Sequence, residues 1–140
     1  MSSVVEITGN TLGINPRTVQ KCRQLDDSLD HPTIKVLNVE REIDRLGGTP
    51  QDQALCYIAL ARLLLDDPDN ASIPREAYGR GEEGAEVTIG RKPATTALLR
   101  ASTCLRLLGS TGYLISTWLT DMAFHPNRTK VDEVYCTLIS

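Results

Sequence analysis

The sequence has few aromatic residues and lacks the clusters that mark common enzyme sites. Only 4% of its 140 residues are aromatic, so the core must be built from leucine, isoleucine, valine and alanine, which favours helices over an aromatic-rich sheet. The two histidines, His31 and His125, each precede a proline at an expected helix boundary. No stretch has the pattern of a catalytic site, so we expect a protein that is not an enzyme and binds no cofactor.

The cysteines are also not arranged as a metal site. Cys22, Cys56, Cys104 and Cys136 lie far apart, without a CxxC pair or the Cys/His spacing of a zinc site. Each lies among apolar residues on an expected helix. We therefore predict no metal, and interpret the four as buried free thiols of a cytoplasmic (intracellular) protein.

Long apolar runs and a strong positive charge are absent too. The longest apolar run, residues 54–65, contains Arg62 and is too short and too charged to span a bilayer. The first residues have no basic start followed by an apolar segment, which predicts no secretory signal and no membrane contact. Because the net charge is −3, any nucleic-acid contact must come from a local patch.

Apolar residues recur at helical spacing along most of the chain. The expected helices begin at Pro16, near Thr33, at Pro50, Pro93 and Tyr113, and at about Thr129. The third is apolar on nearly every face and is expected at the centre, whereas residues 109–112 are expected to break the chain. We predict an all-α, compact single-domain bundle of about five to six helices over residues 1–140.

The apolar spacing also predicts which side chains face the core. They are Val19, Cys22, Leu25 and Leu29; Val36, Val39, Ile43 and Leu46; Leu98, Ala101, Leu105 and Leu108; Leu114, Ile115, Trp118, Leu119 and Met122; and Val131, Tyr135 and Leu138. One segment, residues 67–92, has four glycines and two prolines without helical period, and is expected to be a long irregular loop with a short strand at 86–89.

The segment 12–29, LGINPRTVQKCRQLDDSL, carries the most specific pattern. Asn15 and Pro16 are a helix cap and a first helical residue. Residues 8–27 resemble a generic helix-turn-helix DNA-binding segment. In that resemblance Gly9 is the small residue of the first helix and Gly13 the turn, and the packing positions are Leu12, Ile14, Val19 and Cys22.

The helix-turn-helix resemblance implies a set of DNA contacts. They are Asn15, Arg17, Thr18, Gln20, Lys21 and Arg23. Glutamine can pair with adenine and arginine with guanine in the major groove, and the cations also meet phosphates. The alternative is a capped structural helix that follows an N-terminal strand or arm.

A second group of basic residues lies after the loop. Residues 87–120 contain no Asp or Glu but include Arg91, Lys92, Arg100 and Arg106. This basic surface could contact RNA, DNA or an acidic partner. The alternative is that the acidic part of the loop folds back and neutralises it.

Two classes of function follow. The first is a small non-enzymatic binding protein, regulatory or assembly-related, that contacts DNA or RNA through the helix-turn-helix-like helix, the basic helix or both. The second is a protein–protein adaptor, inhibitor or structural subunit of a larger complex, such as a viral or phage accessory protein, without nucleic-acid contact. Both classes of function are compatible with a homo-oligomer.

Overall fold

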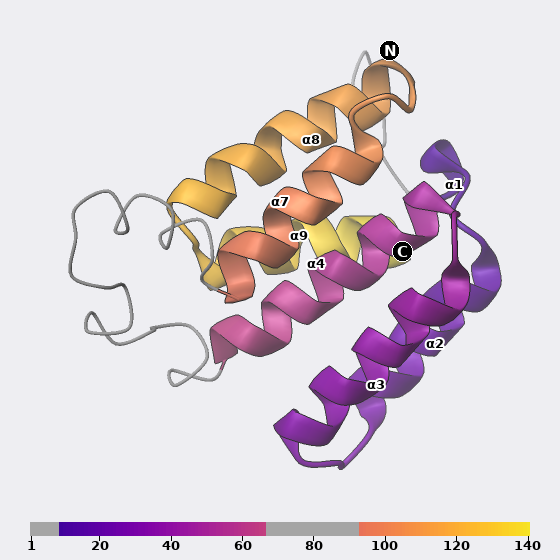
Figure 1. Cartoon of the computed structure of the whole chain (residues 1–140), viewed down its shortest axis with the longest axis vertical. Helices are drawn as coiled ribbons and strands as arrows, with labels where there is room; N and C mark the ends of the chain where they lie inside the picture. Colours follow the sequence, from indigo (N-terminus) through magenta and orange to yellow (C-terminus); the bar gives the residue numbers. More distant parts are fainter. Residues whose placement is uncertain (1–8, 67–92) are drawn as a thin grey trace.

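The computed structural model describes residues 9–66 and 93–140, and in these ranges it contains helices and no strand. The helices are α1 (Gly9–Leu12), α2 (Pro16–Asp27), α3 (Pro32–Leu46), α4 (Pro50–Asp66), α7 (Pro93–Leu105), α8 (Gly109–Phe124) and α9 (Arg128–Ile139), as labelled in Figure 1. The expected all-α bundle is therefore confirmed. The predicted loop at 67–92 and strand at 86–89 lie outside the described residues.

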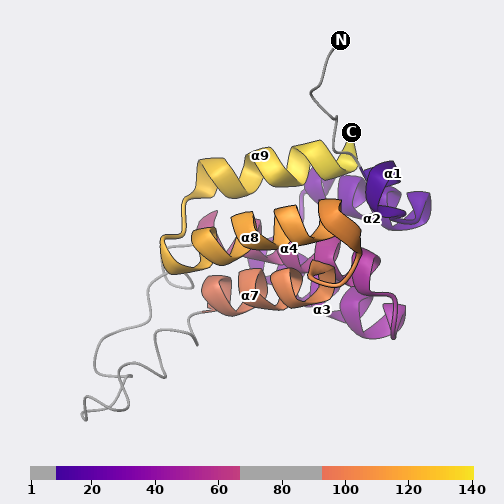
Figure 2. The same ribbon diagram turned by 90° about the horizontal axis from the view of Figure 1, so that it is seen from above.

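The central element of the bundle is α4. It packs against α2, α3, α7 and α9, and Figures 1 and 2 show these helices around it. Its buried residues are Asp52, Ala54, Leu55, Cys56, Ile58, Ala59, Leu60, Ala61 and Leu64. Because apolar residues occupy nearly every face of α4, burial on all sides is the arrangement that removes most apolar surface from water.

The start of each of four helices follows from local sequence. Proline occupies the first position of α2, α3, α4 and α7, where its missing N–H costs no hydrogen bond. The Asn15 side chain caps α2, and Nδ1 of His31 accepts a hydrogen bond from the Thr33 N–H at 3.2 Å at the start of α3. His31 is thus a capping residue.

The connection between α7 and α8 differs from the sequence prediction. Residues 109–112 do not break the chain, because they form the first turn of α8, and the reversal lies at residues 106–108. Gly109 has a φ of +81°, which glycine adopts without strain. Gly112 is buried where α8 approaches the end of α7, since a Cβ at this position would lie 2.5 Å from the Leu105 carbonyl oxygen.

Three side chains predicted to face the core are exposed. Leu29 is 102% exposed because it lies beyond the end of α2, where the helical period no longer decides which way a side chain points. Leu114 and Trp118 are exposed because α8 lies at the outside of the bundle (Figure 2). The predicted inward face of α9, Val131, Tyr135 and Leu138, is buried as expected.

The cysteines divide into two groups. Cys22 and Cys56 are buried free thiols, as predicted. Cys104 is half-buried and Cys136 is exposed, which corrects the prediction for these two. Cys136 follows the buried Tyr135 directly, and a helix turns by about 100° per residue, so it points away from the core.

Candidate functional site

The start of α2 is held in place by both the side chain and the backbone of Asn15. Its side-chain Oδ1 accepts a hydrogen bond from the Arg17 backbone N–H at 2.8 Å. Its backbone N–H donates to Oδ1 of the buried Asp52 at 2.7 Å, at the N-terminus of α4. Gly13, with a φ of +76°, allows the preceding turn. The first turn of α2 therefore has a fixed position on the bundle.

The outward face of α2 carries cations and amides. The exposed residues are Arg17, Gln20, Lys21, Arg23 and Gln24, which succeed one another at spacings of a helical face. Residues 16–25 contain no Asp or Glu. Arginine and lysine can contact phosphates, and arginine and glutamine can contact base edges, so this face carries groups of both kinds. Gln24 belongs to this face, although the sequence interpretation did not select it.

Three residues of the predicted DNA-contact set have other roles. The Asn15 side chain caps α2 and is occupied by the Arg17 N–H. Thr18 is only 3% exposed, which corrects its prediction as a contact, because it lies one turn before the buried Cys22 on the inward face. The Arg23 guanidinium donates a hydrogen bond to the carbonyl of Ile139 at the end of α9. A cation at a helix C-terminus is favourable, so Arg23 fastens α2 to α9 and is only partly available to a ligand.

Two acids end α2. Asp27 is exposed at the end of this face, three residues after Gln24, whereas Asp26 is turned toward a polar cluster. One oxygen of Asp26 lies 3.0 Å from the Arg62 guanidinium, and the other accepts a hydrogen bond from the Tyr135 hydroxyl at 2.9 Å. Arg62 also pairs with Asp132 at 2.9 Å and stacks 3.9 Å from the centre of the Tyr135 ring. Burial raises the pKa of Tyr135, which keeps its hydroxyl a donor. The Asp26 charge is thus neutralised within the bundle.

A cleft of about 360 Å³ extends the basic surface from α2 to α3. Three cations, Lys21, Arg41 and Arg45, and two acids, Asp30 and Glu42, are among the residues that line it. The hydrogen bond from Arg45 holds the pKa of Glu42 below its ordinary value, so Glu42 stays ionised and offsets the Arg45 charge. Lys21 of α2 and Arg41 of α3 are both exposed, so positive charge is present on both helices that line the cleft.

The second predicted basic group does not join this face. Arg100 lies on α7 and Arg106 follows it, and α7 packs against α4 and α8. In Figure 1, α2 and α7 lie on different sides of α4. Arg100 stands 6.0 Å from the centre of the Tyr57 ring and lines a cleft together with Glu40 and Asp44 of α3. The predicted contacts Arg91 and Lys92 lie outside the described residues.

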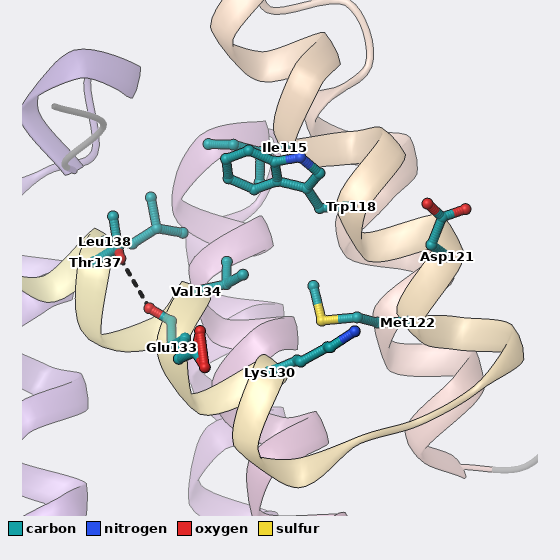
Figure 3. Close-up of a pocket in the computed structure, with 9 residues that line it drawn as sticks. All are labelled: Ile115, Trp118, Asp121, Met122, Lys130, Glu133, Val134, Thr137 and Leu138. Atoms are coloured by element: carbon teal, nitrogen blue, oxygen red, sulfur yellow. Dashed lines mark hydrogen bonds between the residues drawn. The ribbon is translucent and has the colours of Figure 1, made fainter. Parts of the chain in front are cut away.

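Another concave surface, which the sequence interpretation missed, lies between α8 and α9 (Figure 3). It measures about 380 Å³, and its apolar residues are Ile115, Trp118, Met122, Val134 and Leu138. Figure 3 shows the Trp118 ring above this groove, with Lys130 and Glu133 at the α9 side. One signal in the sequence points to this surface, because α8 has a single charged residue, Asp121.

The buried cysteines do not resemble activated nucleophiles. The neighbouring Cys22 thiol and burial both raise the pKa of Cys56, which disfavours the reactive thiolate. His125 is exposed and caps the C-terminus of α8. The roles that these residues have are therefore packing and capping.

Comparison with family models, with curated proteins and with solved structures gives no match to this chain. In residues 9–66 and 93–140, none of the helices has both the length and the apolar character needed to cross a membrane.

Proposed function

We propose that this protein is a small non-enzymatic binding protein that contacts nucleic acid through the outward face of α2. The observation that carries the proposal is the composition of this face, where Arg17, Gln20, Lys21 and Gln24 are exposed together without an acid among residues 16–25. A local patch of this kind can bind phosphates although the chain has a net charge of −3.

Two structural features support α2 as a binding element. The Asn15 cap and its hydrogen bond to Asp52 fix the helix on the bundle, and a fixed helix loses little conformational entropy when it binds. Asp26 is paired with the Arg62 cation and accepts a hydrogen bond from Tyr135, so its charge repels phosphate less than a free carboxylate would. The cations Lys21 and Arg41 widen the contact toward α3.

The test is fluorescence anisotropy of labelled duplex DNA and single-stranded RNA at about 50 and about 200 mM salt, a range over which phosphate contacts weaken strongly. We expect the double variant Arg17→Ala/Lys21→Ala to bind more weakly than the wild type. Its salt dependence should be lower by about one unit of slope for each lost phosphate contact.

The matched control removes the same charge elsewhere. Arg100→Ala/Arg106→Ala changes two exposed cations of the α7 region and should leave binding nearly unchanged. If this pair abolishes binding and the α2 pair does not, the nucleic-acid site lies on the α7 side and the proposal for α2 is wrong. If neither probe binds to the wild type at low salt, the protein belongs to the second class, the protein–protein adaptors and structural subunits.

A further inference from the structure

The exposed face of α8 carries four large apolar side chains. Tyr113, Leu114, Trp118 and Phe124 are between 39% and 63% exposed. At about 100° per residue these four positions lie within one continuous arc of the helix, together with Asp121. In Figure 2, α8 lies between α7 and α9 at the outside of the bundle.

The size of this face is sufficient for a small interface. From the exposed fractions, its four apolar side chains present on the order of 400 Å² to water. Apolar patches of this area on monomers are often functional. When two such faces pack together, the total buried area, with the surrounding polar atoms included, approaches that of the smaller specific protein interfaces. Trp118 also lines the groove between α8 and α9 (Figure 3), so the apolar residues of this groove enlarge the apolar surface.

The charges of α8 favour a second copy of the same helix as the occupant. The N-cap residue of α8, Leu108, makes no side-chain capping bond, and no acid lies in the first turn, so the positive end of the helix dipole is not compensated locally. Asp121, the single charged residue of α8, lies near the opposite end, where a negative charge is unfavourable. When two α8 helices lie antiparallel, Asp121 of each copy comes close to the positive N-terminus of the other. The N-terminus then gains a negative charge, and Asp121 gains a favourable environment.

The sequence positions match such a pair. Thr117 lies midway between Tyr113 and Asp121, so a two-fold axis near Thr117 places Asp121 opposite Tyr113 of the second copy, one turn from the start of its helix. The Tyr113 hydroxyl can then donate a hydrogen bond to the Asp121 carboxylate. The arrangement occurs twice by symmetry, and Leu114 and Trp118 lie between the two contacts.

We propose that the protein forms a two-fold symmetric homodimer in which the exposed faces of α8 pack antiparallel around Thr117. This inference does not depend on nucleic-acid binding by α2.

The first experiment is sedimentation velocity from about 1 to about 200 µM, which brackets micromolar dissociation constants. We expect the wild type to sediment as a dimer of two 15.4 kDa chains at the upper concentrations. Leu114→Glu should raise the dimer dissociation constant at least about 30-fold, because it places an unpaired charge at the centre of the interface. Its thermal melt, followed by circular dichroism, checks that the variant is folded.

The matched control is Leu37→Glu. Leu37 is 48% exposed on α3 and Leu114 is 44% exposed, so the two substitutions add the same charge at equally accessible leucines. Leu37→Glu should dimerise like the wild type. A wild type that stays monomeric throughout would overturn the inference and assign the face to a different protein. Equal loss of dimer in both variants would also overturn it.

Cross-linking tests the position of the axis. A residue near a two-fold axis meets its own copy, so Thr117→Cys should form an intermolecular disulfide under mild oxidation in air. The exposed Cys136 is first changed to serine to remove a competing thiol. Thr103→Cys, at an exposed position of α7, is the control and should not cross-link. A dimer in which Thr117→Cys does not cross-link would place the interface elsewhere and contradict the proposal.

Discussion

At the start of α2, the side chain and the backbone of Asn15 have different partners. The side-chain cap is local and could be predicted, because asparagine followed by proline is a common helix start. The backbone N–H donates to Asp52, which is 37 positions away in the sequence. No local pattern predicts that contact, since it exists only when α2 and α4 meet.

Gly112 gives a prediction at the scale of one residue. Gly→Ala inside a helix normally stabilises it by about 1 kcal/mol. At Gly112 the added Cβ would lie 2.5 Å from the Leu105 carbonyl oxygen and 2.9 Å from the Leu108 Cβ, and the backbone atom cannot move aside cheaply. We expect Gly112→Ala to lower the free energy of unfolding by about 1–3 kcal/mol in urea titrations.

Gly48→Ala is the control for this substitution. A Cβ at Gly48 would have no heavy atom within 4 Å, so the free energy of unfolding should change by less than about 0.5 kcal/mol. If Gly112→Ala were as stable as the wild type, the close approach of α8 to the end of α7 would be wrong.

At the scale of elements, Arg62 on α4 connects two other helices. It pairs with Asp26 of α2 and Asp132 of α9, and it stacks on Tyr135. Its side chain is only 15% exposed, so the guanidinium has little water to replace these partners. Only the interruption of an apolar run marks Arg62 in the sequence, because all its partners lie on other helices.

Replacement of Arg62 should therefore loosen α2 and α9 together. Arg62→Met keeps most of the apolar stem but leaves Asp26 without an ion-pair partner and Asp132 with Arg128 alone. We expect a loss of about 1–3 kcal/mol, because both carboxylates are partly exposed. In native-state hydrogen exchange, Arg62→Met should increase the exchange rates over those of the wild type more in α2 and α9 than in α7 and α8. Arg41→Met, at an exposed position of α3, should leave these rates unchanged; uniform acceleration in all helices would contradict a local role for Arg62.

For the whole molecule, the ion pairs predict how stability depends on pH. Burial alone would raise the pKa of Asp132, but Arg62 and Arg128 outweigh it, and the pKa lies below its ordinary value of 3.8. A carboxyl whose pKa is lower in the folded state stabilises the fold above its unfolded pKa. That contribution is lost as the pH falls through 3.8 toward the folded value. The lowered pKa of Glu42 acts in the same direction.

We therefore expect the melting temperature to fall as the pH is lowered below about 4. Asp132→Asn should melt at a lower temperature than the wild type at neutral pH, and the difference between the two should shrink in acid. Thr137→Asn, at an exposed position of α9, serves as the control and should follow the wild type. A constant difference between Asp132→Asn and the wild type at every pH would show that the Asp132 charge does not contribute.

The amino-acid sequence by itself determined the helical class, the starts of α2, α3, α4 and α7, the central position of α4 and the inward face of α9. These features follow from caps, prolines and apolar periodicity, which act within a few residues or within one helix. The sequence also identified most of the α2 face, because Arg17, Gln20 and Lys21 share one side of a helix wherever that helix packs.

The tertiary structure alone decided which faces stay uncovered. Thr18 became buried and Trp118 exposed because helices pack on only some sides of α2 and α8. It also brought Asp26, Arg62 and Asp132 together from three helices. Such contacts depend on the positions of whole elements relative to one another, and the spacing of residues within one element carries no information about them.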